Sequence, residues 1–236
     1  IGVSGRNGFD YAQPIYFNLA PNFDDTLTPQ IMTERGVALE NEFRWLYSRG
    51  RGQLDTLWMP DDKLRERDRG RVDLSGYHNF NRTWQARSSI QWVSDERYVE
   101  DFSSRVDNFN SSNMKSTFGL YGQGNSWRAG LMADRYQLID YTLTERSLPY
   151  NREPRAYAEW SKQLRPWLEA GIWSEAVRFS HDDVRLKDAD YERTGVSVAM
   201  PGGSRVDIKP YLSMPLAGAS WYATPTVAWR HTEYRL

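Results

Sequence analysis

The stretch QPIYFNLAPNFDDTLTPQIMTERGVALENEFRWLY, residues 13–47, decides the fold class, because it places two turn signals between three strand-like runs. The turn signals are Ala20-Pro21-Asn22 and Glu34-Arg35-Gly36. One face of the third run carries Val37, Leu39, Phe43, Trp45 and Tyr47, and the other carries Ala38, Glu40, Glu42, Arg44 and Ser48. Alternation with a period of two is typical of a strand with one apolar and one polar face, and only Asn41 interrupts it. The stretch therefore predicts consecutive antiparallel strands.

Each of the first two runs contains a proline, Pro14 and Pro29, and a proline cannot donate a hydrogen bond to a sheet. A hairpin centred between Pro21 and Asn22 places the two prolines directly opposite each other. We call this predicted weak point in the first hairpin the seam. A second interpretation stays open, in which edge prolines only protect the sheet from aggregation.

The bulk composition excludes several classes of protein. The 236 residues include 30 Lys and Arg against 31 Asp and Glu, no Cys, 10 Trp and 14 Tyr, and the mean hydropathy is -0.73. The neutral balance gives no sign of a nucleic-acid partner, and the absence of Cys excludes a disulfide or thiolate metal site within the chain. A disordered chain would have fewer aromatic residues, and a helical membrane protein would be more apolar. Strands that alternate polar and apolar residues, with aromatic girdles, account for both properties.

The rest of the chain repeats the alternating pattern in about thirteen strand-like runs, several of them long enough to cross a bilayer. The clearest run is 84–92, with Trp84 and Trp92 at the two ends of its apolar face; others include 194–200 and two strands around a Leu216-Ala217-Gly218 turn. The charged connectors are expected at Pro60–Gly70, Ser94–Asn113 and Asp140–Pro154. The predicted fold class is all-β, an antiparallel transmembrane β-barrel wall that forms a fragment of a larger barrel. A soluble β-sandwich with its charges outward would show the same alternation.

In a barrel wall the charged face lines a wet lumen, and the apolar face meets lipid. The residues expected to face the lumen are Glu40, Glu42, Arg44, Arg87 and Lys209, and those expected to face lipid are Trp84, Trp92, Trp160 and Trp229.

Motifs for catalysis or metal binding are missing from the sequence. The three histidines, His78, His181 and His231, lack the spacing of metal ligands on a helix. His181-Asp182-Asp183 and the acidic residues that follow it are interpreted as a solvated loop rather than an acid–base pair or a calcium loop. No phosphate-binding loop or nucleophile elbow is present, so neither an enzyme nor a bound cofactor is predicted.

Within residues 5–103, ordered motifs closely resemble the start of the barrel in the lipopolysaccharide-assembly outer-membrane protein family (the LptD, or organic-solvent-tolerance, family). The matching residues are Gly5-Arg6-Asn7-Gly8-Phe9-Asp10-Tyr11, Pro14-Ile15-Tyr16-Phe17-Asn18-Leu19-Ala20-Pro21-Asn22-Phe23-Asp24, Thr26-Leu27-Thr28-Pro29, Arg35-Gly36, Glu42-Phe43-Arg44-Trp45-Leu46, Val93-Ser94-Asp95 and Asp101-Phe102-Ser103. Beyond Ser103 only the strand pattern agrees with the family.

The resemblance implies the first half of a very large barrel, over residues 1–236, with the second half and a periplasmic jelly-roll domain absent. It implies an outer-membrane protein of a Gram-negative bacterium that transports lipopolysaccharide and inserts it into the outer leaflet. The barrel would open at a lateral gate between its first and last strands, where Pro14 and Pro29 match the family's seam prolines. The implied partners are lipopolysaccharide, membrane lipid, an LptE-like plug lipoprotein in the lumen and an LptA-like periplasmic bridge protein. A passive porin or a soluble carbohydrate-binding β-sandwich are the alternatives.

Overall fold

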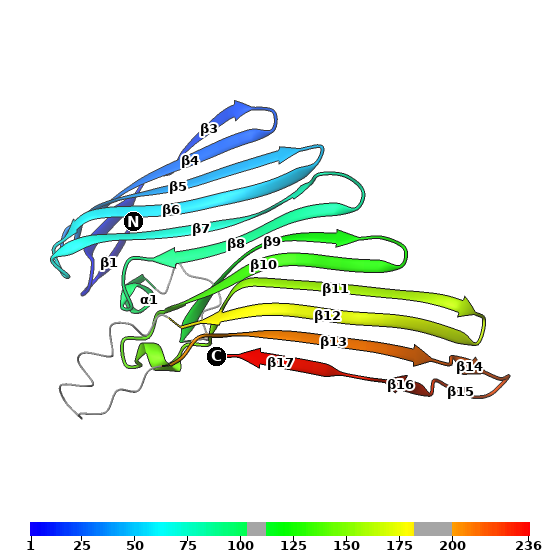
Figure 1. Ribbon diagram of the computed structural model, residues 1–236. Coiled ribbons are helices and arrows are strands. Elements are labelled where there is room, and N and C mark those ends of the chain that lie inside the picture. The colour runs from blue at the N-terminus through cyan, green and yellow to red at the C-terminus, as the bar shows by residue number, and fades with distance from the viewer. Residues whose placement is uncertain (103–111, 182–199) are drawn as a thin grey trace, which may run out of the picture. The chain divides into compact units, whose positions relative to one another are not determined.

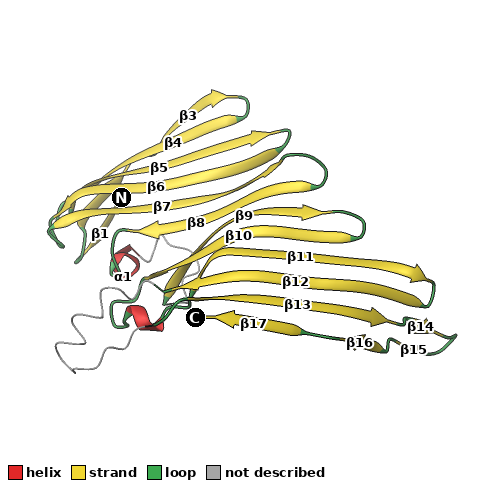
Figure 2. Cartoon of the chain, in the orientation of Figure 1, coloured by secondary structure: helices red, strands yellow, loops and turns green. Residues whose placement is uncertain are grey.

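The computed structural model describes residues 1–102, 112–181 and 200–236, and strands make up most of this part of the chain (Figure 2). The helical segments described are α1 (Tyr98–Phe102) and the 3-10 turn η2 (Glu145–Ser147). Among the described residues, no helix has the length and apolar character needed to cross a membrane. The prediction of an all-β, antiparallel fold is confirmed.

A single antiparallel sheet contains 15 strands, and its order follows the sequence except at its two ends (Figure 1). The main path is β1-β2-β4-β5-β6-β7-β8-β9-β10-β11-β12-β13-β16, while β3 pairs with β4, β17 pairs with β13, and β14 and β15 form a separate pair. The strand bounds are β1 Gly2–Ser4, β2 Gly8–Ala12, β3 Ile15–Ala20, β4 Phe23–Met32, β5 Gly36–Tyr47, β6 Gly50–Asp62, β7 Arg67–Asn79, β8 Trp84–Val93, β9 Asn113–Gln123, β10 Trp127–Leu138, β11 Asn151–Arg165, β12 Leu168–Ser180, β13 Gly203–Ser213, β14 Leu216–Ala217, β15 Tyr222–Ala223, β16 Thr226–Ala228 and β17 His231–Arg235.

The described chain divides into two compact units. Unit 1 comprises Ile1–Asn79, Arg87–Phe118 and Tyr136–Leu148, and it holds β1 to β7 together with α1. Unit 2 comprises Phe80–Ala86, Gly119–Arg135 and Pro149–Leu236, and it holds β11 to β17.

In unit 1 the apolar face of the sheet is exposed. Trp58 of β6 is 58% exposed, whereas its neighbours Leu57 and Met59, on the opposite face, are 3% and 0% exposed. Val37 and Leu39 of β5 are likewise exposed on either side of the buried Ala38. A continuous exposed apolar face marks a surface that another protein or lipid covers.

The core of unit 1 lies on the other face, at the end of the sheet where β4 turns into β5 and β6 into β7. There α1 contributes Tyr98 and Phe102, and the sheet contributes buried residues of several strands; the full set is Met32, Ala38, Leu57, Met59, Val93, Tyr98, Phe102, Met114 and Ile139. Segment 94–102, expected to be a polar connector, therefore folds back against the sheet and packs there.

In unit 2 the same alternation holds from β10 to β13. The exposed face carries Leu131 of β10, Trp160 and Ile172, together with Val206, Ile208 and Leu212 of β13, while Asp207 between them is fully buried. On the polar face Tyr211 lies over Gly171, its directly paired partner, and a Cβ at Gly171 would come within 2.3 Å of the tyrosine ring. A side chain at position 171 would displace this ring from the sheet.

Several predicted boundaries were wrong. Pro60–Gly70 is no connector, because β6 continues to Asp62 and β7 begins at Arg67, with only a four-residue turn between them. The turn expected at Leu216-Ala217-Gly218 begins later, since Leu216 and Ala217 pair with Ala223 and Tyr222. The described residues form seventeen strands rather than about thirteen, and six of these are only two to five residues long. The strand expected at 194–200 and the acidic loop from Asp182 to Asp190 lie outside the described residues.

Candidate functional site

The seam is a break in the first long strand of the sheet. β2 pairs with residues 30–32 of β4 and β3 pairs with residues 23–27, while Gln13 and Pro14 between them belong to neither strand. The backbone N–H of Gln13 donates to the carbonyl oxygen of Pro29 at 3.1 Å. On its other side β4 pairs with β5 without interruption from Phe23 to Met32. The weakness is therefore confined to one edge of β4.

The two prolines are not opposite each other, so the predicted register was wrong by one residue. The register shifts between Asn18 and Ala20, close to the turn, and from there Asn18 pairs with Asp24 and Ile15 with Leu27. A bulge inserts one residue into one strand and moves every later pair by one position. Consequently Pro29 faces Gln13 instead of Pro14.

In this register the N–H groups that Pro29 and Pro14 lack belong to different sides of the first strand. Pro29 leaves the side toward β4 without a donor, and Pro14 leaves the outer side without one. The N–H and C=O of one residue point to the same side of an antiparallel strand, and successive residues alternate sides. Because the carbonyl of Pro29 accepts from Gln13, the N–H that Pro29 lacks would have pointed at Gln13 as well. Pro14 follows Gln13, so the donor that it lacks belongs to the free edge of β3. Among the described residues, β3 pairs with β4 alone, and it lies at the edge of the unit 1 sheet (Figure 1).

Glu40, Glu42 and Arg44 lie on one face of β5, as the alternation predicted. Arg44 donates two hydrogen bonds to Asp24, at 2.7 and 3.0 Å, and Arg71 donates one to Glu40 at 3.1 Å. These groups are partly or largely exposed, so each pair contributes little to stability. They form a charged surface on the face opposite the exposed apolar side chains.

Arg87 lies on the same charged face of unit 1. It is exposed on β8, and Gln91, which shares its face at a spacing of four residues, donates to Asp73 at 3.1 Å. Asp73 in turn pairs directly with Asp55 of β6 on the charged face.

Lys209 lies on the charged face of unit 2, exposed and directly paired with Trp173. Next to it Glu175 accepts from Arg155 at 2.6 Å and also from Arg205, and Asp207 accepts from Arg230 at 3.0 Å. A row of alternating charges thus crosses β11, β12 and β13 and ends at Arg230, between β16 and β17. The lumen-facing role of these residues stays a prediction.

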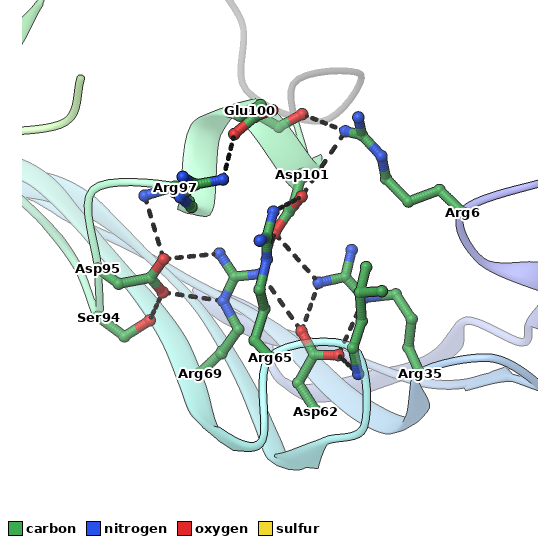
Figure 3. Close-up of polar contacts among 11 residues, drawn as sticks. Arg6, Arg35, Asp62, Arg65, Arg69, Ser94, Asp95, Arg97, Glu100 and Asp101 are labelled. Carbon is green, nitrogen blue, oxygen red and sulfur yellow. Dashed lines mark hydrogen bonds and ion pairs between the residues drawn. The ribbon is translucent and has the colours of Figure 1, made fainter. Parts of the chain in front are cut away.

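A buried group of charges lies at the turns of unit 1, and we call it the arginine cluster: Arg35, Asp62, Arg65, Arg69, Asp95 and Asp101 (Figure 3). Arg35 comes from the β4–β5 turn, Arg65 from the β6–β7 turn, Arg69 from the start of β7, and Asp101 from α1. The side chains of Arg35, Asp62 and Arg69 are fully buried. The cluster ties two hairpin turns to the helix.

Arg69 is the centre of the arginine cluster. It donates to Asp95 at 2.8 and 2.9 Å, to Asp62 at 3.2 Å and to Asp101 at 2.5 Å. Arg65 holds Asp101 in a fork of two hydrogen bonds of 2.8 Å, and the ring of Phe102 lies 4.2 Å from the guanidinium carbon of Arg35. Planar guanidinium groups suit such paired and stacked contacts, whereas lysine could not make them.

The electrostatics of the arginine cluster favour ionised Asp101. Burial alone would raise the pKa of this carboxyl, but hydrogen bonds from Arg65 and Arg69 and the charges of Arg69 and Arg35 lower it to about 2. The same pairing raises the pKa of Arg65. Asp101 therefore stays charged at every physiological pH and holds its two arginines in place.

Sequence reasoning missed the arginine cluster because it treated 60–70 and 94–113 as solvated connectors. A signal was nevertheless present, since Arg35, Asp95, Asp101 and Phe102 all occur within the motifs that carry the family resemblance. Among the described residues, no three His, Cys, Asp or Glu side chains are placed to hold a metal ion.

Comparison with known proteins gives one consistent family. The family model described as "LPS transport system D" (LptD) matches residues 67–236. The LPS-assembly protein LptD of Xanthomonas campestris pv. campestris (strain 8004) is 58% identical over 249 residues, covering 100% of this chain and 31% of the relative. The LPS-assembly protein LptD of Xylella fastidiosa (strain Temecula1 / ATCC 700964) is 54% identical over 241 residues, covering 100% of this chain and 30% of the relative. The chain thus spans about a third of the length of these curated relatives.

Proposed function

The chain belongs to the LptD family, and from this premise we propose that the whole protein transports lipopolysaccharide and inserts it into the outer leaflet of a Gram-negative outer membrane. The present residues would form the first half of its barrel. The exposed apolar face of the sheet would meet membrane lipid, and the charged face with Glu40, Glu42, Arg44, Arg87 and Lys209 would line the lumen. Apolar-out and polar-in alternation is the pattern of transmembrane barrels.

The observation that carries the proposal is the placement of the two missing N–H groups beside β3. Pro29 cannot donate a hydrogen bond to Gln13, which weakens the pairing between β4 and the first strand. Pro14 cannot donate a hydrogen bond from the outer edge of β3. In a closed barrel that outer edge pairs with the last strand, so the bond that Pro14 cannot make is one across the closure. A lipid with a large glycan can leave through the wall only where the wall separates, and the lateral gate is therefore assigned to this edge.

The partners follow from the same route. Lipopolysaccharide would arrive from an LptA-like bridge protein through a periplasmic jelly-roll domain outside this chain, and an LptE-like lipoprotein would plug the lumen. The charged face offers both donors and acceptors to such a plug, including the exposed pair Arg44 and Glu42. Neither a passive porin nor a carbohydrate-binding sandwich receives support from the relatives.

The experiment replaces Pro14 and Pro29 by alanine in the full-length protein. The donor restored at position 14 would strengthen the closure and the donor restored at position 29 would strengthen the first hairpin, each by about 0.5–1.5 kcal/mol. The gate would then open less readily, and lipopolysaccharide export would be impaired. We expect outer-membrane permeability to large antibiotics to rise while the amount of folded barrel stays unchanged. Pro210→Ala is the matched control, because Pro210 lies inside the sheet on β13 and accepts from Trp229 as Pro29 accepts from Gln13. Normal permeability in a well-folded double variant would assign the prolines to edge protection alone.

A further inference from the structure

The one residue that interrupts the alternation of β5, Asn41, belongs to a row of polar side chains on the exposed apolar face. On this face Asn41 lies between Leu39 and Phe43. It pairs directly with Thr56 of β6, and its amide donates a hydrogen bond to Asp25 of β4. We call Asp25, Asn41 and Thr56 the polar row.

Register places all three residues on the apolar face. Asp25 pairs directly with Phe43, Asn41 with Leu27, and Thr56 with Val72. Direct cross-strand partners share a face of the sheet, so the polar row cannot belong to the charged face. It crosses three adjacent strands, and it begins on β4, where Asp25 also pairs directly with Phe17 of the edge strand β3.

Apolar groups enclose the row on both sides. Toward the β3–β4 turn, Phe23 stacks on Phe43 with ring centroids 6.2 Å apart, and Phe43 contacts Trp45 at 5.7 Å. Toward the other end lie the exposed side chains of Ile31, Val37, Leu39 and Trp58. If this face meets lipid, the aromatic group marks the interfacial girdle and the polar row lies just inside it. A carboxylate at such a depth is costly, and residues of this kind usually serve a function.

The chemistry of the polar row is that of a hydrogen-bond acceptor. One Asp25 oxygen accepts from Asn41, and among the described residues the other oxygen, the Asn41 carbonyl and the Thr56 hydroxyl have no side-chain partner. Acceptors beside a carboxylate attract hydroxyl and ammonium donors and repel phosphate. The ligand that fits is therefore a group that donates hydrogen bonds, and on a glycolipid these donors are mainly sugar hydroxyls.

We propose that the polar row is a hydrogen-bonding site for the hydroxyl-rich part of the exported glycolipid, occupied as the lipid leaves the edge strand β3 and enters the outer leaflet. This inference rests on the proposed function. Asp25 next to β3 receives the first hydroxyl, and Asn41 and Thr56 offer further acceptors away from the edge. The row gives the polar part of the lipid acceptors that the hydrocarbon around the barrel lacks.

The test places a photo-crosslinking phenylalanine analogue at Ile15, Phe43 or Ile90 of the full-length protein, one position at a time, in cells with and without lipopolysaccharide supply. Phe43 lies directly beside Asp25 and outside the polar row, so the probe leaves the three polar side chains in place. Ile15 on β3 reports export itself, and Ile90, on the apolar face of β8, is the control for general lipid contact. We expect lipopolysaccharide adducts at Ile15 and Phe43 that disappear when supply stops, and none at Ile90. Asp25→Leu should lower the adduct at Phe43 about threefold to tenfold, as the loss of one hydrogen bond predicts, without lowering the amount of folded barrel.

The possible results separate the two proposals. An adduct at Ile15 with none at Phe43 overturns the polar row and leaves export intact. No adduct at either position counts against the proposed function as well. Adducts at Phe43 that persist without supply would show ordinary membrane lipid beside the row, and a barrel that folds poorly as Asp25→Leu would show a structural hydrogen bond; either result overturns the site.

Discussion

The seam and the arginine cluster lie in the same unit and involve the same strand, yet they are opposite in construction. At the seam, β4 faces a broken strand across a proline and gains one backbone hydrogen bond there, from Gln13 to Pro29. Just beyond its end, the turn that carries Arg35 is locked to Asp62 and, through Asp101, to α1. The difference indicates that the arginine cluster fixes the turns of unit 1, so that any separation of strands is confined to the edge formed by β3.

A second proline region shows which part of the seam matters. On β13, Pro210 accepts from Trp229 at 3.1 Å, and the partner strand is broken between β16 and β17 just as the first strand is broken between β2 and β3. A single proline is therefore enough to accompany a break in the neighbouring strand. What distinguishes the seam is Pro14, which removes a donor from the outer edge of β3 as well.

The largest expected effect comes from breaking the arginine cluster. Arg69→Met leaves the buried Asp95 without its guanidinium partner and removes one of the two or more arginines that compensate Asp62 and Asp101. Removing one partner of a buried ion pair costs about 3–5 kcal/mol. Denaturant unfolding of the full-length protein in detergent should show this loss. The matched control is Arg44→Met, which removes an exposed pair with Asp24 and should cost at most about 1 kcal/mol. Equal losses in the two variants would show that the cluster does not clamp the turns.

An intermediate effect is expected from acid. Asp101 has a pKa of about 2 in the folded protein against an ordinary value of 3.8. A lowered pKa means that the folded state holds the charged form more tightly, so its stabilisation is complete above about pH 4 and is lost as the pH falls toward 2. The shift corresponds to about 2 kcal/mol.

The measurement is the free energy of unfolding between pH 5 and pH 2, compared with Asp101→Asn. The variant should start less stable and lose less over this range. Parallel curves for the two proteins would mean that Asp101 carries none of the acid sensitivity.

The sequence predicts which face of a strand a side chain occupies, because this depends on alternation. It does not predict which residues pair across strands, because this depends on register. The faces of Glu40, Arg44 and Leu39 follow from a period of two, because each strand keeps its parity along its length. The cross-strand partner of Pro29 does not follow from this period, because a bulge near the turn shifts all later pairs by one residue. The arginine cluster brings together residues from three separate turns. These turns are far apart in the sequence, so no local pattern predicts the contacts between them. In the sequence Asn41 is visible only as an interruption of the alternation in β5. Nothing in the sequence indicates that Asp25 belongs to the apolar face, which becomes evident only from its pairing with Phe43.

The smallest effect concerns the seam itself, and it separates the two prolines. Pro29→Ala restores an N–H that points at the carbonyl of Gln13, so it should strengthen the pairing of β4 with the first strand by about 0.5–1.5 kcal/mol. Pro14→Ala restores a donor on the other side, at the outer edge of β3, and should leave that pairing unchanged. Global stability is a poor measure, because removing a proline also gives the unfolded chain more freedom. Amide hydrogen exchange at Gln13 and Ile15, which both point toward β4, is the appropriate readout in the full-length protein. Exchange should slow by up to about tenfold in Pro29→Ala and stay unchanged in Pro14→Ala. Equal slowing in both variants would restore the facing-proline register and remove the assignment of Pro14 to the outer edge.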